Sequence, residues 1–235
     1  MNSTGMSDST TGMSDAARFV VRPRRRTTWL VEGARHLHVV MCIQLVWLLL
    51  TLLGLIVVGI APATCAAADA LRAQRRGELT GLLPRMWESY RRELIPANVR
   101  MLPLMAVQVL ALAMLWQAAA GLSSNPAMMA VLGTLGAIAA GWATVSLAAI
   151  AVAPRVRRQE VLVAWRLALL MPGAVPFRGL ALVVLAAAWM LVSTTVWPLA
   201  LLLGAGLAID AAVALLATRI GLLLEDLGGQ DPASH

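Results

Sequence analysis

Long apolar runs separated by short polar segments dominate the pattern of this chain. The first run covers residues 39–60, and about 20 apolar residues at 1.5 Å per residue match the ~30 Å hydrocarbon core of a bilayer. Two further runs cover residues 101–121 and 127–153. The last, residues 179–217, is too long for one crossing and should divide near Trp197 and Pro198. The pattern therefore predicts five full membrane-spanning helices.

A short alanine-rich segment follows a break at Gly59-Ile60-Ala61-Pro62. Seven arginines lie in residues 72–100, and they would face outward if the chain stayed on the far side of the membrane. Because arginines collect on the cytoplasmic side, the chain should return through residues 62–71. We expect a helix with Pro62 in its first turn, too short for a full crossing, that spans a thinned region or re-enters.

Residues 78–97 repeat apolar side chains at helical spacing, with charged side chains on the other faces. This pattern predicts an interfacial helix in the inner headgroup plane, either a docking surface for a partner or an anchor on anionic lipid. Residues 160–178 predict a second, shorter interfacial helix. The candidate partner or lipid surface consists of Leu79, Leu83, Met86, Trp87, Tyr90 and Leu94.

Composition agrees with a membrane protein, since 60% of the residues are hydrophobic and 13% are charged. All 19 basic residues are arginines between the apolar runs, a distribution that indicates cytoplasmic loops and excludes nucleic-acid binding. We therefore predict an all-α, polytopic membrane bundle of five spans plus the short helix, in the bacterial inner (cytoplasmic) membrane, with both termini cytoplasmic. Residues 1–28 should form a disordered basic tail, 29–224 the membrane domain, and 225–235 a flexible acidic tail.

Asp210 is the sharpest candidate for function. It lies about nine residues before Arg219, hence about 13 Å into the membrane, where a charge is costly unless it is paired or protonated. It could be a proton- or substrate-linked site near the midplane. It could also be a structural carboxyl that hydrogen-bonds to Gln108, Gln117 or a threonine of a neighbouring helix.

The segment around Pro62 holds the other candidates. Asp69 lies one turn before Arg72 and could pair with Arg72 or Arg76. Pro62 and Thr64 belong to a helix break of the kind that lines binding sites in transporters, although such a break also simply reverses the chain.

We expect no catalytic, metal or cofactor site. The two cysteines, Cys42 and Cys65, should lie too far apart along the membrane normal for a disulfide, and the sequence has no Cys-x-x-Cys motif. One deep carboxylate without a nucleophile and its base does not predict an enzyme.

The residues around the break resemble a YesL-like family of bacterial integral membrane proteins with a domain of unknown function. The resemblance covers roughly residues 44–95. At residues 93–94 the chain has Glu-Leu where the family usually has Asn-Phe. The matching motifs are Trp47, Gly59-Ile60-Ala61-Pro62-Ala63-Thr64, Arg75-Arg76-Gly77-Glu78 and Trp87-Glu88-Ser89-Tyr90-Arg91-Arg92.

The resemblance implies a five- or six-helix protein from gene neighbourhoods of sugar-uptake systems. We therefore expect a non-enzymatic accessory or regulatory protein associated with carbohydrate uptake, whose partners are the lipid bilayer and a transporter complex or a second copy of itself. The alternative is a small transporter or channel that uses Asp210.

Overall fold

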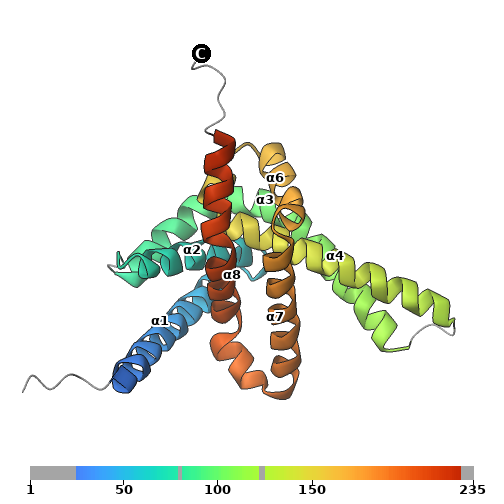
Figure 1. Cartoon of the computed structure of the whole chain (residues 1–235), viewed down its shortest axis with the longest axis horizontal. Helices are drawn as coiled ribbons and strands as arrows, with labels where there is room; N and C mark the ends of the chain where they lie inside the picture. The colour runs from blue at the N-terminus through green and yellow to red at the C-terminus, as the bar shows by residue number, and fades with distance from the viewer. Residues whose placement is uncertain (1–24, 79–80, 122–124, 229–235) are drawn as a thin grey trace, which may run out of the picture. The chain divides into compact units, whose positions relative to one another are not determined.

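The computed structural model describes residues 25–78, 81–121 and 125–228, and all regular structure within these ranges is helical (Figure 1). The chain divides into two units, residues 1–38 and 39–235, and the sections below concern the second. The helices are α1 (Arg25–Leu53), α2 (Val57–Arg75), α3 (Leu82–Ala119), α4 (Pro126–Val152), α5 (Pro154–Arg157), α6 (Val161–Ala174), α7 (Pro176–Thr195) and α8 (Trp197–Gly228).

Four helices in the described part of the chain are long and apolar enough to cross a membrane, which confirms the predicted class of all-α membrane protein. They are Val31–Leu53 of α1, and α3, α4 and α7. Within α8, the described apolar stretch is Leu203–Leu216. The last apolar tract divides where predicted, since α7 ends at Thr195 and α8 begins at Trp197. The predicted short helix after the Arg155–Arg158 cluster is also present, as α6.

The first chain reversal lies earlier than predicted. It occurs at Gly54–Ile56, and Leu55 and Ile56 both adopt left-handed φ angles, 56° and 58°. A Cβ on Gly54 would collide with the Cα of Gly59, so this hairpin closes only because both positions are glycine. The predicted break at residues 59–62 is therefore wrong. Pro62 lies inside α2, which is a continuous helix of 19 residues rather than a short one.

The predicted interfacial helix and the following span form one helix instead of two. α3 contains 38 residues, which gives a length of about 57 Å, nearly twice the hydrocarbon core of a bilayer. Pro96 and Pro103 lie within α3 and do not end it. Its first half is charged and amphipathic, and its second half, from Met101, is the apolar part that is long enough to cross.

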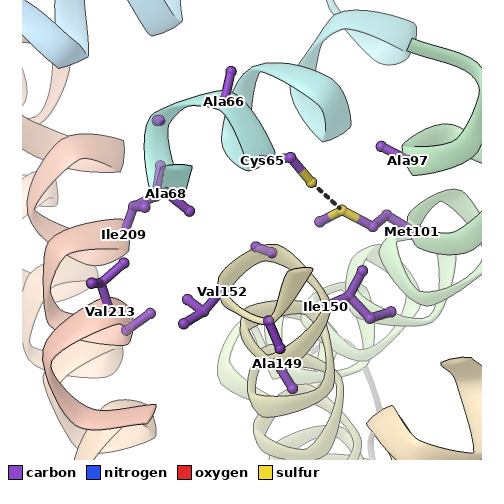
Figure 2. Packing of buried hydrophobic residues seen from close by; sticks show 14 of the residues in the cluster. Cys65, Ala66, Ala68, Ala97, Met101, Ala149, Ile150, Val152, Ile209 and Val213 are labelled. Carbon is purple, nitrogen blue, oxygen red and sulfur yellow. Dashed lines mark hydrogen bonds between the residues drawn. The ribbon is translucent and has the colours of Figure 1, made fainter. Parts of the chain in front are cut away.

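The core is built around α2, whose alanines let the neighbouring helices approach closely. Alanines 61, 63, 66–68, 70 and 73 of α2 are all buried. Figure 2 shows Ala68 beside Ile209 of α8, while Cys65 faces Met101 of α3. The Cys65 thiol lies 3.8 Å from the Met101 sulfur, and both cysteines are free thiols as predicted. The helix predicted to be a marginal return segment is thus the most enclosed element of the described chain.

Several expectations lie outside the described residues. These are residues 1–24 of the predicted N-terminal tail, Leu79 of the predicted surface, and residues 229–235 of the predicted C-terminal tail. Within the described chain, α1 begins at Arg25 and α8 extends to Gly228, so both helices include a few residues that we had assigned to tails.

Candidate functional site

Pro62 and Thr64 have structural partners inside α2. Proline has no N–H, so the carbonyl of Val58 lacks its usual helical donor. The side-chain amide of Asn98, on α3, donates to this carbonyl at 2.8 Å. Thr64 donates to the carbonyl of Ile60 at 2.7 Å, and its hydroxyl accepts the indole N–H of Trp47 at 3.2 Å. These motif residues therefore connect α2 to α1 and α3.

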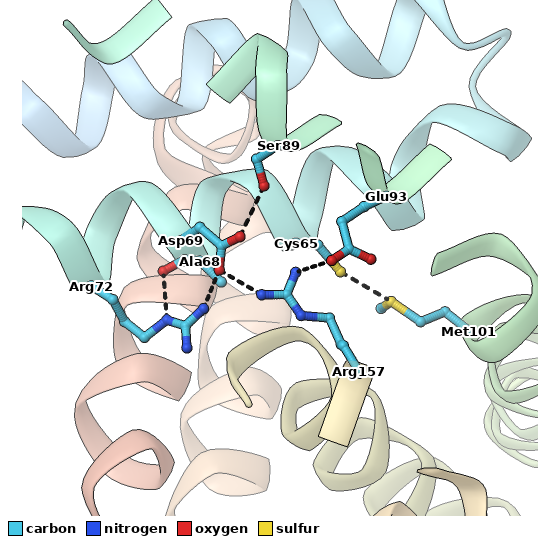
Figure 3. A network of polar contacts seen from close by, with 8 residues as sticks. All are labelled: Cys65, Ala68, Asp69, Arg72, Ser89, Glu93, Met101 and Arg157. Atoms are coloured by element: carbon cyan, nitrogen blue, oxygen red, sulfur yellow. Dashed lines mark hydrogen bonds and ion pairs between the residues drawn. The ribbon is translucent and has the colours of Figure 1, made fainter. Parts of the chain in front are cut away.

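Asp69 is the centre of a polar network that joins three segments (Figure 3). Its carboxylate forms an ion pair with Arg72 of α2 and a second with Arg157 of α5, the latter at 2.5 Å. The hydroxyl of Ser89, on α3, donates to the other carboxylate oxygen at 2.8 Å. Of the two partners that the sequence suggested, Arg72 is confirmed. Arg76 instead pairs with Glu78 at 3.0 Å.

Arg157 is the most enclosed charge of this network, with only 2% of its side chain exposed. Its second carboxylate neighbour is Glu93, at 3.6 Å. Burial alone would lower the pKa of the guanidinium, but Cys65, Asp69 and Glu93 outweigh burial and raise the pKa above its ordinary value. Arg157 is therefore a permanent buried cation, and two of its nitrogens, Nε and Nη1, have no hydrogen-bond partner.

The network opens into a cavity of about 900 Å³ between the end of α2, the charged half of α3 and α5. Charged side chains dominate its lining, and arginines outnumber acids. The arginines are Arg72, Arg76, Arg85, Arg92, Arg100, Arg157 and Arg158, and the acids are Asp69, Glu88 and Glu93. This volume lies in the range of small-molecule sites in proteins.

Asp210 lies outside this cavity and has a basic partner, Arg75, that the sequence interpretation did not name. Arg75 of α2 donates to its carboxylate at 2.7 Å. The side chain of Asp210 is 15% exposed and that of Arg75 is 39% exposed. Gln108, which we considered as a partner of Asp210, instead accepts a hydrogen bond from Thr144 at 3.3 Å.

The predicted partner or lipid surface divides between two faces of α3. Met86 and Tyr90 are buried in the core, and Leu94 is partly buried against it, so these three cannot form a surface. Leu83 and Trp87 are exposed. The exposed stripe of α3 continues from them through Ile95 to Val99, residues that the sequence interpretation did not select.

Sequence reasoning missed Arg157 and Asn98. Arg157 stood among three arginines that served only to orient the chain, and nothing in their spacing distinguishes it from Arg155 or Arg158. One signal was available: the carboxylate of Asp69 follows a run of alanines expected to pack closely, and a buried carboxylate requires a cation nearby. That signal does not identify which cation.

The long apolar helices define the class: the protein is a polytopic α-helical membrane protein. The charged cavity lies outside the apolar half of α3. Within that class, residues 40–115 match the family described as "Protein of unknown function, DUF624", which is consistent with the resemblance to the YesL-like family. The matched segment contains α2 and most of α3, and hence Asp69, Ser89 and Glu93 but not Arg157. No curated protein and no solved structure matches the chain.

Proposed function

We propose that this protein is a non-enzymatic accessory or regulatory protein of the bacterial inner membrane that acts with a carbohydrate uptake system. In this proposal both chain ends and the charged half of α3 face the cytoplasm. The observation that carries the proposal is the exposed stripe of α3, formed by Leu83, Trp87, Ile95 and Val99. The association with carbohydrate uptake rests on the family resemblance.

The stripe is a separate surface from the part of α3 that stabilises the fold. Met86 and Tyr90 on the buried face already pack in the core, while Ile95 on the stripe is 74% exposed. Trp87 stacks on Tyr90, with ring centroids 6.0 Å apart and an interplanar angle of 13°. A tryptophan supported in this way from beneath is a typical anchor of a protein interface.

The positive charge beside the stripe indicates an acidic partner. Arg91 lies between Trp87 and Ile95 on α3, and both Arg91 and Arg92 are exposed. An amphipathic helix with acidic side chains beside its apolar face would complement this surface. We propose that such a helix belongs to a membrane or cytoplasmic subunit of the importer.

Affinity purification from native membranes in a mild detergent tests this proposal, with the full-length chain as bait. Trp87→Ala should reduce recovery of the importer subunit at least about tenfold, because anchors of this kind contribute about 2 kcal/mol or more. The matched control is Trp116→Ala, which removes an exposed tryptophan from the apolar half of the same helix and should leave recovery unchanged. Three results would refute the proposal. They are recovery of the chain alone, recovery of the chain with anionic lipid only, and recovery of the same amount of the importer subunit by the two variants.

The alternative function is a small transporter or channel with an acidic site at Asp210. The observation that favours it is the Arg75–Asp210 ion pair between α2 and α8, since paired charges within apolar helices often lie on substrate or ion pathways. Substrate flux in proteoliposomes that Asp210→Asn abolishes would support this alternative. Flux that is absent, or equal in the variant, would exclude it.

A further inference from the structure

The cavity beside Asp69 carries an excess of positive charge. Seven arginines and three acidic residues line it, so the lining has a formal charge of +4 (7 − 3). A water-accessible hollow with this imbalance concentrates anions. These charged side chains come from α2, α3 and the α5 segment. They surround one volume of about 900 Å³ and so act on the same space.

Four of these arginines form no ion pair within the described part of the chain. Arg85, Arg92, Arg100 and Arg158 have no carboxylate within ion-pair distance among the residues that the structure describes. Two of them are held in place by backbone carbonyls: Arg85 donates to the carbonyl of Glu78 at 2.9 Å, and Arg100 donates to the carbonyl of Gln159 at 3.0 Å. These bonds position the guanidinium groups and leave their charge available.

Two arginines that line the cavity have buried nitrogens without a hydrogen bond. Arg157 lines the cavity, is almost completely buried, and has no hydrogen bond at Nε or Nη1. The Nε of Arg100 is likewise buried and without a partner. Buried N–H groups of this kind are rare in proteins, because each lost hydrogen bond costs free energy.

We infer that this cavity binds a phosphate-bearing anion. A phosphate group offers three acceptor oxygens and close to two negative charges, which suits several guanidinium groups better than a single carboxylate does. The planar fork of arginine binds phosphate in a bidentate manner. Asp69 and Glu93 are positioning residues, since they hold the Arg157 guanidinium from two sides (Figure 3). The inference is independent of the proposed importer partner.

Two sources share this chemistry, namely a soluble phosphorylated small molecule and a phospholipid headgroup. The probe for the first is inorganic pyrophosphate, titrated against the full-length protein in a neutral detergent with the melting temperature as the readout. The probe for the second is a phosphatidylcholine nanodisc with or without phosphatidic acid, with the same readout. Saturable stabilisation in either arm supports the inference, and the arm in which it occurs identifies the source.

Adjacent arginines on α3 provide a matched pair of variants. Arg92→Gln removes a cavity charge, whereas Arg91→Gln removes a neighbouring exposed charge that does not line the cavity. Arg92→Gln, and likewise Arg158→Gln, should weaken the apparent affinity about tenfold, the equivalent of one charge-assisted hydrogen bond. Arg91→Gln should leave the affinity within about twofold. All three positions are exposed, so the melting temperatures without ligand should stay close to that of the parent protein.

Two results would overturn the inference. The first is no saturable stabilisation by pyrophosphate in detergent and none by phosphatidic acid in nanodiscs. The second is equal weakening by Arg91→Gln and Arg92→Gln, which would show that the anion responds to the general charge of α3 and not to the cavity.

Discussion

Replacing Asp69 by asparagine should destabilise the protein more than any other single change in the polar network. The substitution keeps the size of the side chain and removes its charge. It leaves both Arg72 and Arg157 without their shared carboxylate partner. Arg157 cannot relieve the loss by giving up its proton, because arginine stays protonated in proteins. Its remaining carboxylate neighbour, Glu93, is 3.6 Å away.

The expected magnitude follows from the burial of the two cations. Removing one partner of a buried ion pair costs about 3–5 kcal/mol. Arg157 is 2% exposed and Arg72 is 16% exposed, so neither cation is well solvated. The side chain of Asp69 is itself 22% exposed, which places the expected cost at the lower end, about 3 kcal/mol. That cost corresponds to about a hundredfold change in the ratio of folded to unfolded protein.

The assay is unfolding by sodium dodecyl sulfate in mixed micelles, followed by tryptophan fluorescence. Arg157→Gln is the comparison, because Asp69 then keeps Arg72 and the hydroxyl of Ser89. We expect Asp69→Asn to cost more than Arg157→Gln, and the double variant to be more stable than Asp69→Asn alone. An Asp69→Asn variant as stable as the parent, or a double variant with the summed cost of both, would refute the role of Asp69 as the shared partner.

Two further predictions use the same titration. Asn98→Leu removes the donor to the Val58 carbonyl and should cost about 1–3 kcal/mol. Adding Pro62→Ala restores a backbone N–H for that carbonyl, so the double variant should recover part of the loss, and strictly additive costs would contradict this account. Asp210→Asn should cost at most about 1 kcal/mol, because its partner Arg75 is 39% exposed. A loss of 3 kcal/mol or more would show that this pair is shielded from water.

The apolar pattern identified most helices because a backbone surrounded by lipid must satisfy its own hydrogen bonds. Each N–H and C=O within the hydrocarbon core needs a partner in its own segment, so a long apolar run is a helix almost regardless of its residues. The Trp197-Pro198 pair marked the division between α7 and α8 correctly, since proline is favoured in the first turn of a helix.

The chain reversal between α1 and α2 could not be read in the same way. Leu55 and Ile56 adopt left-handed backbone angles that β-branched and bulky residues rarely take. What makes the reversal possible is the contact between Gly54 and Gly59, which is a tertiary feature. Pro62 was the more obvious local signal, and its missing hydrogen bond is compensated by Asn98 from another helix.

Only part of the candidate site could be predicted from the sequence, for a related reason. The partner at three residues, Arg72, follows from helical spacing, and the structure confirms it. Arg157 lies 88 residues from Asp69, and spacing carries no information over that distance. The cavity exists because α2, α3 and α5 bring three separate arginine clusters together, although the sequence had assigned those clusters only to one side of the membrane.

The two prolines inside α3 mark a place where that helix can bend. Pro96 and Pro103 each remove one backbone hydrogen bond, and they bracket the place where the charged half meets the apolar half. The charged half is roughly 28 Å long, so a bend of about 10° at this joint displaces its far end by about 5 Å. Arg85 and Arg92 lie on this charged half, while Arg157 belongs to α5. If α3 bends at these prolines to match the thickness of the bilayer, the spacing of the arginines around the cavity changes with it, and membrane thickness would then alter the affinity for the anion that we propose.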